Sequence, residues 1–250
     1  MTTMTLTPTR RTTWPVGLAL GSMAGTALVI AGVWNALIQQ HVSVSAPPHV
    51  SQEVPPVRTM EIYYTWYAGT VAQERAATIL GLIGVSGLVI LVAELRRRLG
   101  PRLGRGACTA AQAGGLVWMV GAVAAIGGHR AVGLMATHGN PIETVNAVAF
   151  TTDVTSDAFS AASFVLLAVA MPALAAASLG GRGRSFGGQG WAALSVLTGL
   201  LSAVVAYGYV AGIDSITSYD LGILAAVLMP CWLVWTGRLL DRSEPSESSI

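Results

Sequence analysis

Six runs of apolar residues, each long enough to cross a lipid bilayer, constrain this chain more than any other feature. The hydrocarbon core of a membrane is about 30 Å thick, and a helix of about 20 residues crosses it. Because an unpaired backbone N–H or C=O is costly in lipid, a single run of this length crosses as a helix. The runs cover residues 14–38, 76–95, 108–128, 156–180, 191–212 and 219–240. The sequence therefore predicts an all-α, polytopic membrane helical bundle of six transmembrane helices over 14–240, with tails at 1–13 and 241–250.

Composition agrees with this prediction. Of the 250 residues, 53% are hydrophobic and 10% are charged, whereas soluble domains carry about 25% charged residues. The hydrophilic interruptions between the runs are short, which predicts one compact bundle without a separate soluble domain. All 14 basic residues are arginine. A Schiff base to retinal or pyridoxal phosphate needs a lysine amine, so the composition excludes that chemistry.

The arginines orient the bundle. Arginine and lysine accumulate in short cytoplasmic loops of membrane proteins. With both termini in the cytoplasm, only Arg58, Arg75 and Arg130 lie outside. The other 11 lie inside: Arg10, Arg11, Arg96, Arg97, Arg98, Arg102, Arg105, Arg182, Arg184, Arg238 and Arg242. We therefore predict cytoplasmic N and C termini, and an inner arginine surface suited to anionic lipid headgroups rather than to nucleic acid.

The first run carries a row of small residues. Gly17, Gly21 and Gly25 form two overlapping GxxxG motifs, and Gly32 follows one heptad later. Glycines at this spacing let two helix backbones approach closely in a membrane. The motif predicts a close helix contact, and the partner is either another helix of this chain, a second copy in a homo-oligomer, or a subunit of a membrane complex.

Residues 140–180 predict one continuous helix that is polar and amphipathic in its first part and apolar in its second part. Asn140 is the expected N-cap, Pro141 the first helical residue and Glu143 an acid in the first turn. An outer amphipathic helix is predicted over 140–155. Spacings of 3, 4, 3 and 4 place five residues on one helix face. They are Glu143, Asn146, Phe150, Asp153 and Asp157.

The segment 39–75 is predicted to be an outer loop. It contains two proline pairs, 47–48 and 55–56, which favour extended chain. The aromatic residues that follow predict a short helix at the level of the lipid headgroups, where amphipathic rings settle. They are Tyr63, Tyr64, Trp66 and Tyr67.

Asp153 and Asp157 are four residues apart at the start of the fourth apolar run. Two carboxylates this close can share a proton, as acid–base pairs and proton relays do. Together with Glu143 they are the candidate catalytic residues, and Arg130 is a candidate counter-ion. A solvated helix end or a structural ion pair explains the same residues without function.

All four histidines, His41, His49, His129 and His138, map to the outer side. Imidazole and carboxylate together are ligands for transition metals, so these histidines are candidate metal ligands. No HxxxH, HExxH or ExxH pair is present, and outer loops are also where polar residues collect. No other cofactor is indicated.

Two cysteines, Cys108 and Cys231, lie in apolar runs. We predict that both are buried small apolar side chains. A disulfide or a reactive thiolate is the alternative, but no CxxC motif or Cys/His spacing supports a zinc or redox site.

From about residue 76 to 240, three features follow one another: a basic loop after the second run, a Gly/Arg loop after the fourth, and the ending WLVWTGRLL. In this order the chain resembles a group of uncharacterised six-helix bacterial inner-membrane proteins. The resemblance covers about two thirds of the chain and implies a fold and a bacterial inner-membrane location, with no activity attached.

Three hypotheses follow. The first is a non-catalytic membrane protein that binds a lipid, an apolar small molecule or a membrane partner at its outer face. The second is a membrane enzyme or redox subunit with a metal or acid–base site at His129, His138, Asp153 and Asp157. The third is a proton- or ion-coupled transporter that uses the aspartate pair.

Overall fold

The computed structural model describes residues 15–45, 56–99, 103–180, 186–213 and 221–242, without the side chains of 36, 38–45 and 56–74. Every element in this part of the chain is helical, and six helices are long and apolar enough to cross a membrane. The predicted membrane bundle is confirmed. The helices are α1 (Val16–Ser45), α2 (Pro56–Arg98), α3 (Leu103–Thr137), α4 (Ile142–Leu179), α5 (Gly188–Ala211) and a last helix of three parts, α6 (Leu221–Ile223), the π-helical η2 (Leu224–Leu228) and α7 (Met229–Arg242).

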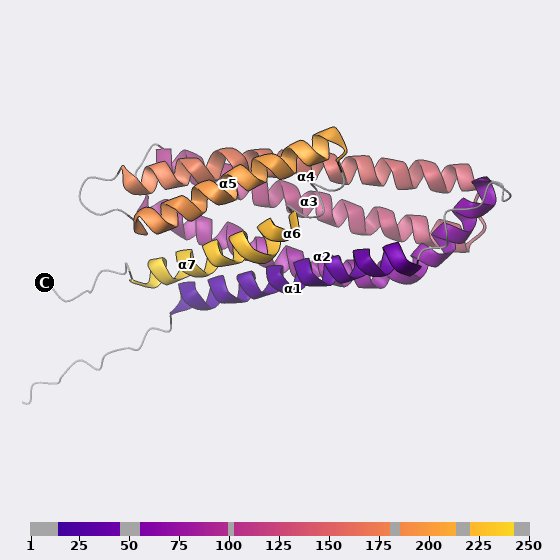
Figure 1. Cartoon of the computed structure of the whole chain (residues 1–250), viewed down its shortest axis with the longest axis horizontal. Helices are drawn as coiled ribbons and strands as arrows, with labels where there is room; N and C mark the ends of the chain where they lie inside the picture. The colour runs from indigo at the N-terminus through magenta and orange to yellow at the C-terminus, as the bar shows by residue number, and fades with distance from the viewer. Residues whose placement is uncertain (1–14, 46–55, 100–102, 181–185, 214–220, 243–250) are drawn as a thin grey trace, which may run out of the picture.

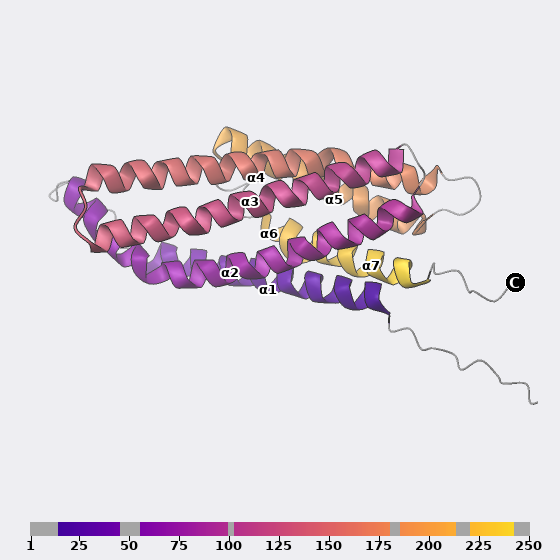
Figure 2. The same cartoon turned by 180° about the vertical axis from the view of Figure 1, so that it is seen from behind.

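Helices that follow one another in the chain lie side by side from α1 to α5, and α7 returns to pack against α1 (Figures 1 and 2). The start of α1 and the end of α7 therefore lie at the same end of the bundle. An even number of crossings has this consequence for any membrane bundle.

Three helices are much longer than a bilayer requires. α2, α3 and α4 contain 43, 35 and 38 residues, whereas α5 contains 24. At 1.5 Å per residue, α3 and α4 are about 52 and 57 Å long. They continue with α2 beyond the level where α5 ends (Figure 1). We call residues 124–137 of α3 and 142–155 of α4, which lie in the part of the two helices beyond that level, the helical extension.

Two local predictions were wrong. The predicted outer loop 39–75 is largely helical, because α1 continues to Ser45 and α2 begins at Pro56. A proline interrupts a helix interior but is accepted at the first helical position, so Pro56 starts α2 instead of preventing it. Asn140 is not the N-cap of α4: Pro141 is, and the Asn140 side-chain amide donates 3.1 Å to the Met135 carbonyl at the end of α3.

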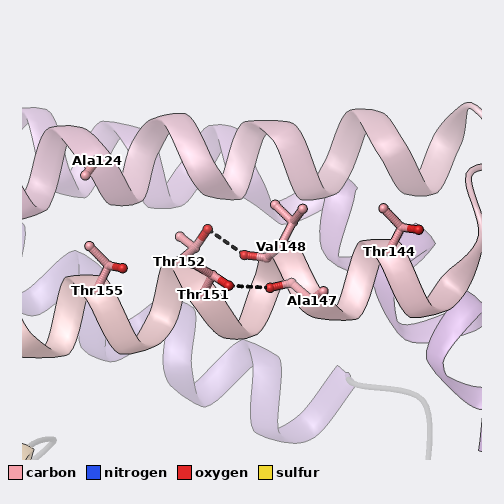
Figure 3. A pocket seen from close by; sticks show the side chains of 7 residues that line it. All are labelled: Ala124, Thr144, Ala147, Val148, Thr151, Thr152 and Thr155. Atoms are coloured by element: carbon pink, nitrogen blue, oxygen red, sulfur yellow. Dashed lines mark hydrogen bonds between the residues drawn. The ribbon is translucent and has the colours of Figure 1, made fainter.

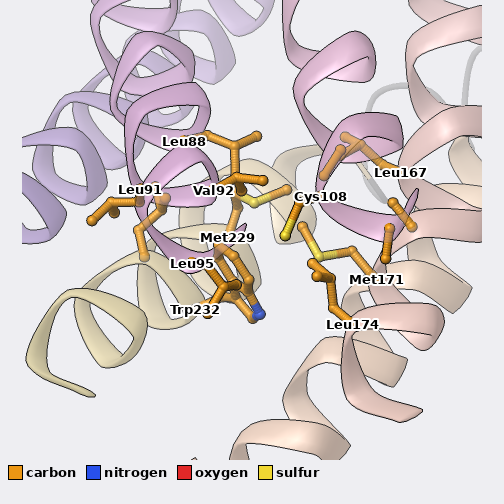
Figure 4. Close-up of a cluster of buried hydrophobic side chains, with 14 of the residues drawn as sticks. Leu88, Leu91, Val92, Leu95, Cys108, Leu167, Met171, Leu174, Met229 and Trp232 are labelled. Carbon is orange, nitrogen blue, oxygen red and sulfur yellow. The ribbon is translucent and has the colours of Figure 1, made fainter. Parts of the chain in front are cut away.

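The apolar core, part of which is shown in Figure 4, is built from buried side chains of α1, α2, α3, α4, α5, η2 and α7. The buried polar residues in the described ranges are all serine or threonine. Most of their hydroxyls donate to a carbonyl of their own helix, as Ser202 does to Thr198 at 2.7 Å. The largest side chains of the core are Trp191, Trp232, Leu88, Leu91, Leu95, Met171, Leu174, Leu224 and Leu233.

The glycine row of α1 packs against α7 of the same chain. A Cβ atom on Gly17 would lie 2.7 Å from the Gly237 carbonyl oxygen, and one on Gly21 would lie 2.5 Å from that of Leu233. The close helix contact is therefore intramolecular at this face. Binding of a second copy or a complex subunit stays a prediction.

A carboxylate caps α1 at one end of this contact between α1 and α7, which we call the α1–α7 seam. Asp241 of α7 accepts hydrogen bonds from the backbone N–H groups of Gly17 at 2.8 Å and Leu18 at 2.7 Å. These N–H groups belong to the first turn of α1, where no carbonyl of the helix can reach them. A negative charge there also interacts favourably with the helix dipole. The last turn of α7 thus completes the first turn of α1.

Candidate functional site

A pocket of about 390 Å³ opens on the helical extension (Figure 3). Six of its lining residues come from the first half of α4 and one, Ala124, comes from α3. The α4 residues recur every three or four positions, which places them on one side of the helix. They are Thr144, Ala147, Val148, Thr151, Thr152 and Thr155.

The pocket is more apolar than its threonine content suggests, because threonine hydroxyls in it bind their own helix. The Thr151 hydroxyl donates 2.7 Å to the Ala147 carbonyl, and the Thr152 hydroxyl donates 2.8 Å to that of Val148 (Figure 3). A hydroxyl that is bound to its own helix leaves its methyl group as the exposed part of the side chain. The middle of the pocket therefore presents methyl groups from Thr, Ala and Val.

The pocket continues a stripe of exposed side chains along α4. From Thr144 the exposed positions follow at steps of three or four residues down to Val165 and Val169, which are 51% and 66% exposed. Threonine gives way to alanine and then to valine along this stripe. The full series is Thr144, Ala147, Thr151, Thr155, Ala158, Ala162, Val165 and Val169. An apolar chain lying on the span could therefore extend into the pocket without crossing a charged residue.

The predicted acidic face lies on the other side of α4. Positions two residues apart on a helix differ by about 200°, so Asp153 and Asp157 point away from Thr151 and Thr155. Phe164, seven residues after Asp157 on the same face, stacks on Tyr209 of α5 with ring centroids 6.0 Å apart. Because α5 ends at Ala211, the acidic face lies just beyond the part of α4 that α5 covers.

One predicted pair is brought together. His129 Nε2 lies 3.3 Å from Asp153 Oδ1, and their side chains are 29% and 65% exposed. The hydrogen bond links α3 to α4 across the extension. The partner of Asp153 is thus His129, one position before the predicted Arg130, whose side chain is exposed.

Asp157 lies one helical turn after Asp153 on the same face of α4, whereas the other described candidate residues lie apart from the His129–Asp153 pair. His138 directly follows the last residue of α3, nine residues after His129 and about 13 Å from it, and its Nδ1 lies 2.7 Å from the Leu134 carbonyl oxygen of α3. Glu143 and Asp157 are exposed. His49 and the side chain of His41 lie outside the described residues. Among the residues that are described, no group of three His, Cys, Asp or Glu is placed to hold a metal ion, so the metal site stays a prediction.

Sequence reasoning missed the threonine pocket. Its signal was the recurrence of threonine at 144, 151, 152 and 155, which shares one side of a helix. The predicted site residues of α4 were the charged ones, which lie on the opposite face of the helix. Comparison of the chain with protein-family models, curated proteins and solved structures gives no match.

Proposed function

We propose that this chain is a non-catalytic integral membrane protein that binds a lipid, or an apolar small molecule of similar shape, in the threonine pocket. The observation that carries the proposal is the pocket itself. Its volume of about 390 Å³ falls in the range of about 300–1,000 Å³ typical of small-molecule sites. Methyl groups form its floor, which favours a hydrocarbon ligand over a charged one.

The ends of the pocket suit a polar headgroup. The hydroxyls of Thr144 and Thr155 make no hydrogen bond within the described ranges, unlike those of Thr151 and Thr152. They can donate to an ester or hydroxyl oxygen of a ligand. The apolar stripe below the pocket would then carry an acyl chain toward the bilayer. This combination favours an amphipathic lipid.

We also propose a bacterial inner-membrane location with both termini in the cytoplasm. The end of the bundle that holds the termini carries Arg96, Arg97, Arg105, Arg238 and Arg242. The positive-inside rule supports the cytoplasm for that end. The helical extension, with the pocket, would then lie on the outer side.

Mass spectrometry of the protein released from detergent tests the binding proposal. We expect the parent to retain a lipid, and Val148→Trp, which fills the pocket, to lose most of it. Val204→Trp is the matched control, because it adds the same side chain to an exposed position on α5, outside both the pocket and the stripe. Equal retention in both variants, or no retained lipid in the parent, would contradict the proposal.

The His129–Asp153 pair supports a second candidate, an acid–base or metal site at the outer face. A histidine hydrogen-bonded to a carboxylate is a common arrangement both in proton transfer and beside metals. Elemental analysis and an optical spectrum of the purified parent and of a His129→Ala/His138→Ala variant test it. A stoichiometric metal that the variant loses would support this candidate, and a metal-free parent would leave the binding function.

A further inference from the structure

Three sulfur-containing side chains from three helices belong to one buried cluster in the apolar core. Cys108 of α3 and Met171 of α4 are 0% exposed, Met229 of α7 is 6% exposed, and all three belong to the same buried cluster. In the view of Figure 4 the three side chains are directed toward one another. None of these residues contributes to the threonine pocket or to the His129–Asp153 pair.

These three residues supply all the buried sulfur in the described part of the chain. In the described part of the chain, Met171 and Met229 are the buried methionines and Cys108 is the buried cysteine. Cys231, predicted to be buried, is exposed. The buried sulfur of the described core is thus gathered in one place, surrounded by Leu88, Val92, Leu95 and Trp232 (Figure 4). Methionine commonly fills core gaps, but gap filling does not require its sulfur to face a thiol.

We propose that Cys108, Met171 and Met229 form a binding site for Cu(I). Thiolate and thioether sulfurs are soft ligands that select Cu(I) over harder cations. The buried residues around them that are described carry no carboxylate or imidazole to favour another metal.

The charge balance of the site suits its surroundings. As the Cu–S bond to Cys108 forms, the thiol gives up its proton to solvent, and copper keeps its oxidation state. The thiolate and Cu(I) together are neutral, and both methionine ligands are uncharged. A neutral complex avoids the cost of burying an isolated charge in an apolar core. The flexible methionine side chains can adjust around the ion, because three rotatable bonds separate each sulfur from the backbone sites that packing fixes.

Titration of the purified full-length protein with Cu(I), in detergent under reducing conditions and in competition with bicinchoninate, tests this site. We expect the parent to take one equivalent from the competitor. Cys108→Ser should lose the site, and Met171→Leu and Met229→Leu should each weaken it by at least the roughly 10–100-fold that loss of an outer-shell partner costs a metal site. Cys231→Ser, which removes the exposed thiol, should bind as the parent does.

The shape of the site provides a second readout. X-ray absorption of the copper-loaded parent should give a first shell of sulfur alone, and a shell with nitrogen or oxygen would overturn the assignment. Retention of copper by a folded Cys108→Ser variant, or its loss in Cys231→Ser, would overturn it as well. The leucine variants conserve volume, so they are expected to fold even where Cys108→Ser does not.

Discussion

The indole N–H of Trp232 donates a hydrogen bond of 2.8 Å to the Ser195 hydroxyl, which itself donates 2.9 Å to the Trp191 carbonyl. A second bond runs the other way, from the Trp191 indole N–H to the Thr236 hydroxyl at 2.9 Å. The two rings also pack together, with centroids 5.7 Å apart. α5 and α7 are therefore joined by a reciprocal pair of side-chain hydrogen bonds in a dry part of the bundle.

Ser195→Ala should destabilise the bundle, because it leaves the buried Trp232 N–H without its acceptor. An unsatisfied buried donor costs about 1–3 kcal/mol, and unfolding in mixed detergent micelles would measure the change in free energy. Ser202→Ala is the control: its hydroxyl is equally buried but donates only to the Thr198 carbonyl of its own helix. We expect the control to cost below about 1 kcal/mol. Equal losses would contradict a role for the α5–α7 hydrogen bonds.

Gly237→Ala should separate α1 from α7. Its Cβ would collide with the Gly17 backbone at the closest point of the seam, and overpacking of this kind typically costs about 1–3 kcal/mol. Gly106→Ala gives the comparison, since a Cβ on this helical glycine meets nothing within 4 Å. That variant should keep or raise the unfolding free energy, because alanine is the better helix former. A neutral Gly237→Ala would argue against the observed approach of the two helices.

Asp241→Ala should remove the cap of α1. Loss of an N-cap side chain costs about 0.5–2 kcal/mol, and hydrogen exchange of the Gly17 and Leu18 amides should accelerate together. Arg242→Ala removes the neighbouring exposed charge and should leave both amides unchanged. Unaltered exchange in Asp241→Ala would mean that these N–H groups are protected by something other than the carboxylate.

Asp153→Asn should hardly affect stability. Its carboxylate is 65% exposed, and solvent-exposed ion pairs contribute about 0–1 kcal/mol. Thermal unfolding of the variant in detergent should therefore match the parent closely. A large loss would show that the link between α3 and α4 holds the helical extension together, and that the pair serves the fold rather than a site.

A green fluorescent protein fused after residue 250 should fluoresce, and alkaline phosphatase at the same position should be inactive. The prediction rests on the arginine-rich end of the bundle, where α7 finishes at Arg242. An active phosphatase fusion would reverse the bundle and place the threonine pocket on the cytoplasmic side.

Most of the fold could be predicted because bilayer thickness imposes a length on each span. The glycines at 17, 21 and 25 also identified a close seam, although their partner, α7, could not be named without the order of the helices in space. The length of α2 could not be predicted in the same way. Hydropathy marks where a helix is apolar, and the helix of 56–74 continues through polar sequence that resembles a loop.

The site was less predictable than the fold. His129 and Asp153 were identified by their chemistry, and the structure brings them within 3.3 Å. His138 is separated from this pair because the helical rise over nine residues carries it away from His129. The sequence allowed a helix there but did not require one. The threonine pocket was missed because threonine is classed as a polar residue in a sequence. In the structure, the hydroxyls of Thr151 and Thr152 bind carbonyls of their own helix, and their methyl groups form the exposed surface.

The contact between Asp241 and Gly17 joins positions 224 residues apart. A ribosome that adds about 5–20 residues per second takes roughly 10–45 s to cover that separation. During this time α1 is already in the membrane while its glycine row has no α7 to cover it. Closure of the α1–α7 seam is therefore a late event in biosynthesis, and a chain that stops before α7 would expose a helix-binding surface to any insertion factor or neighbouring helix in the bilayer.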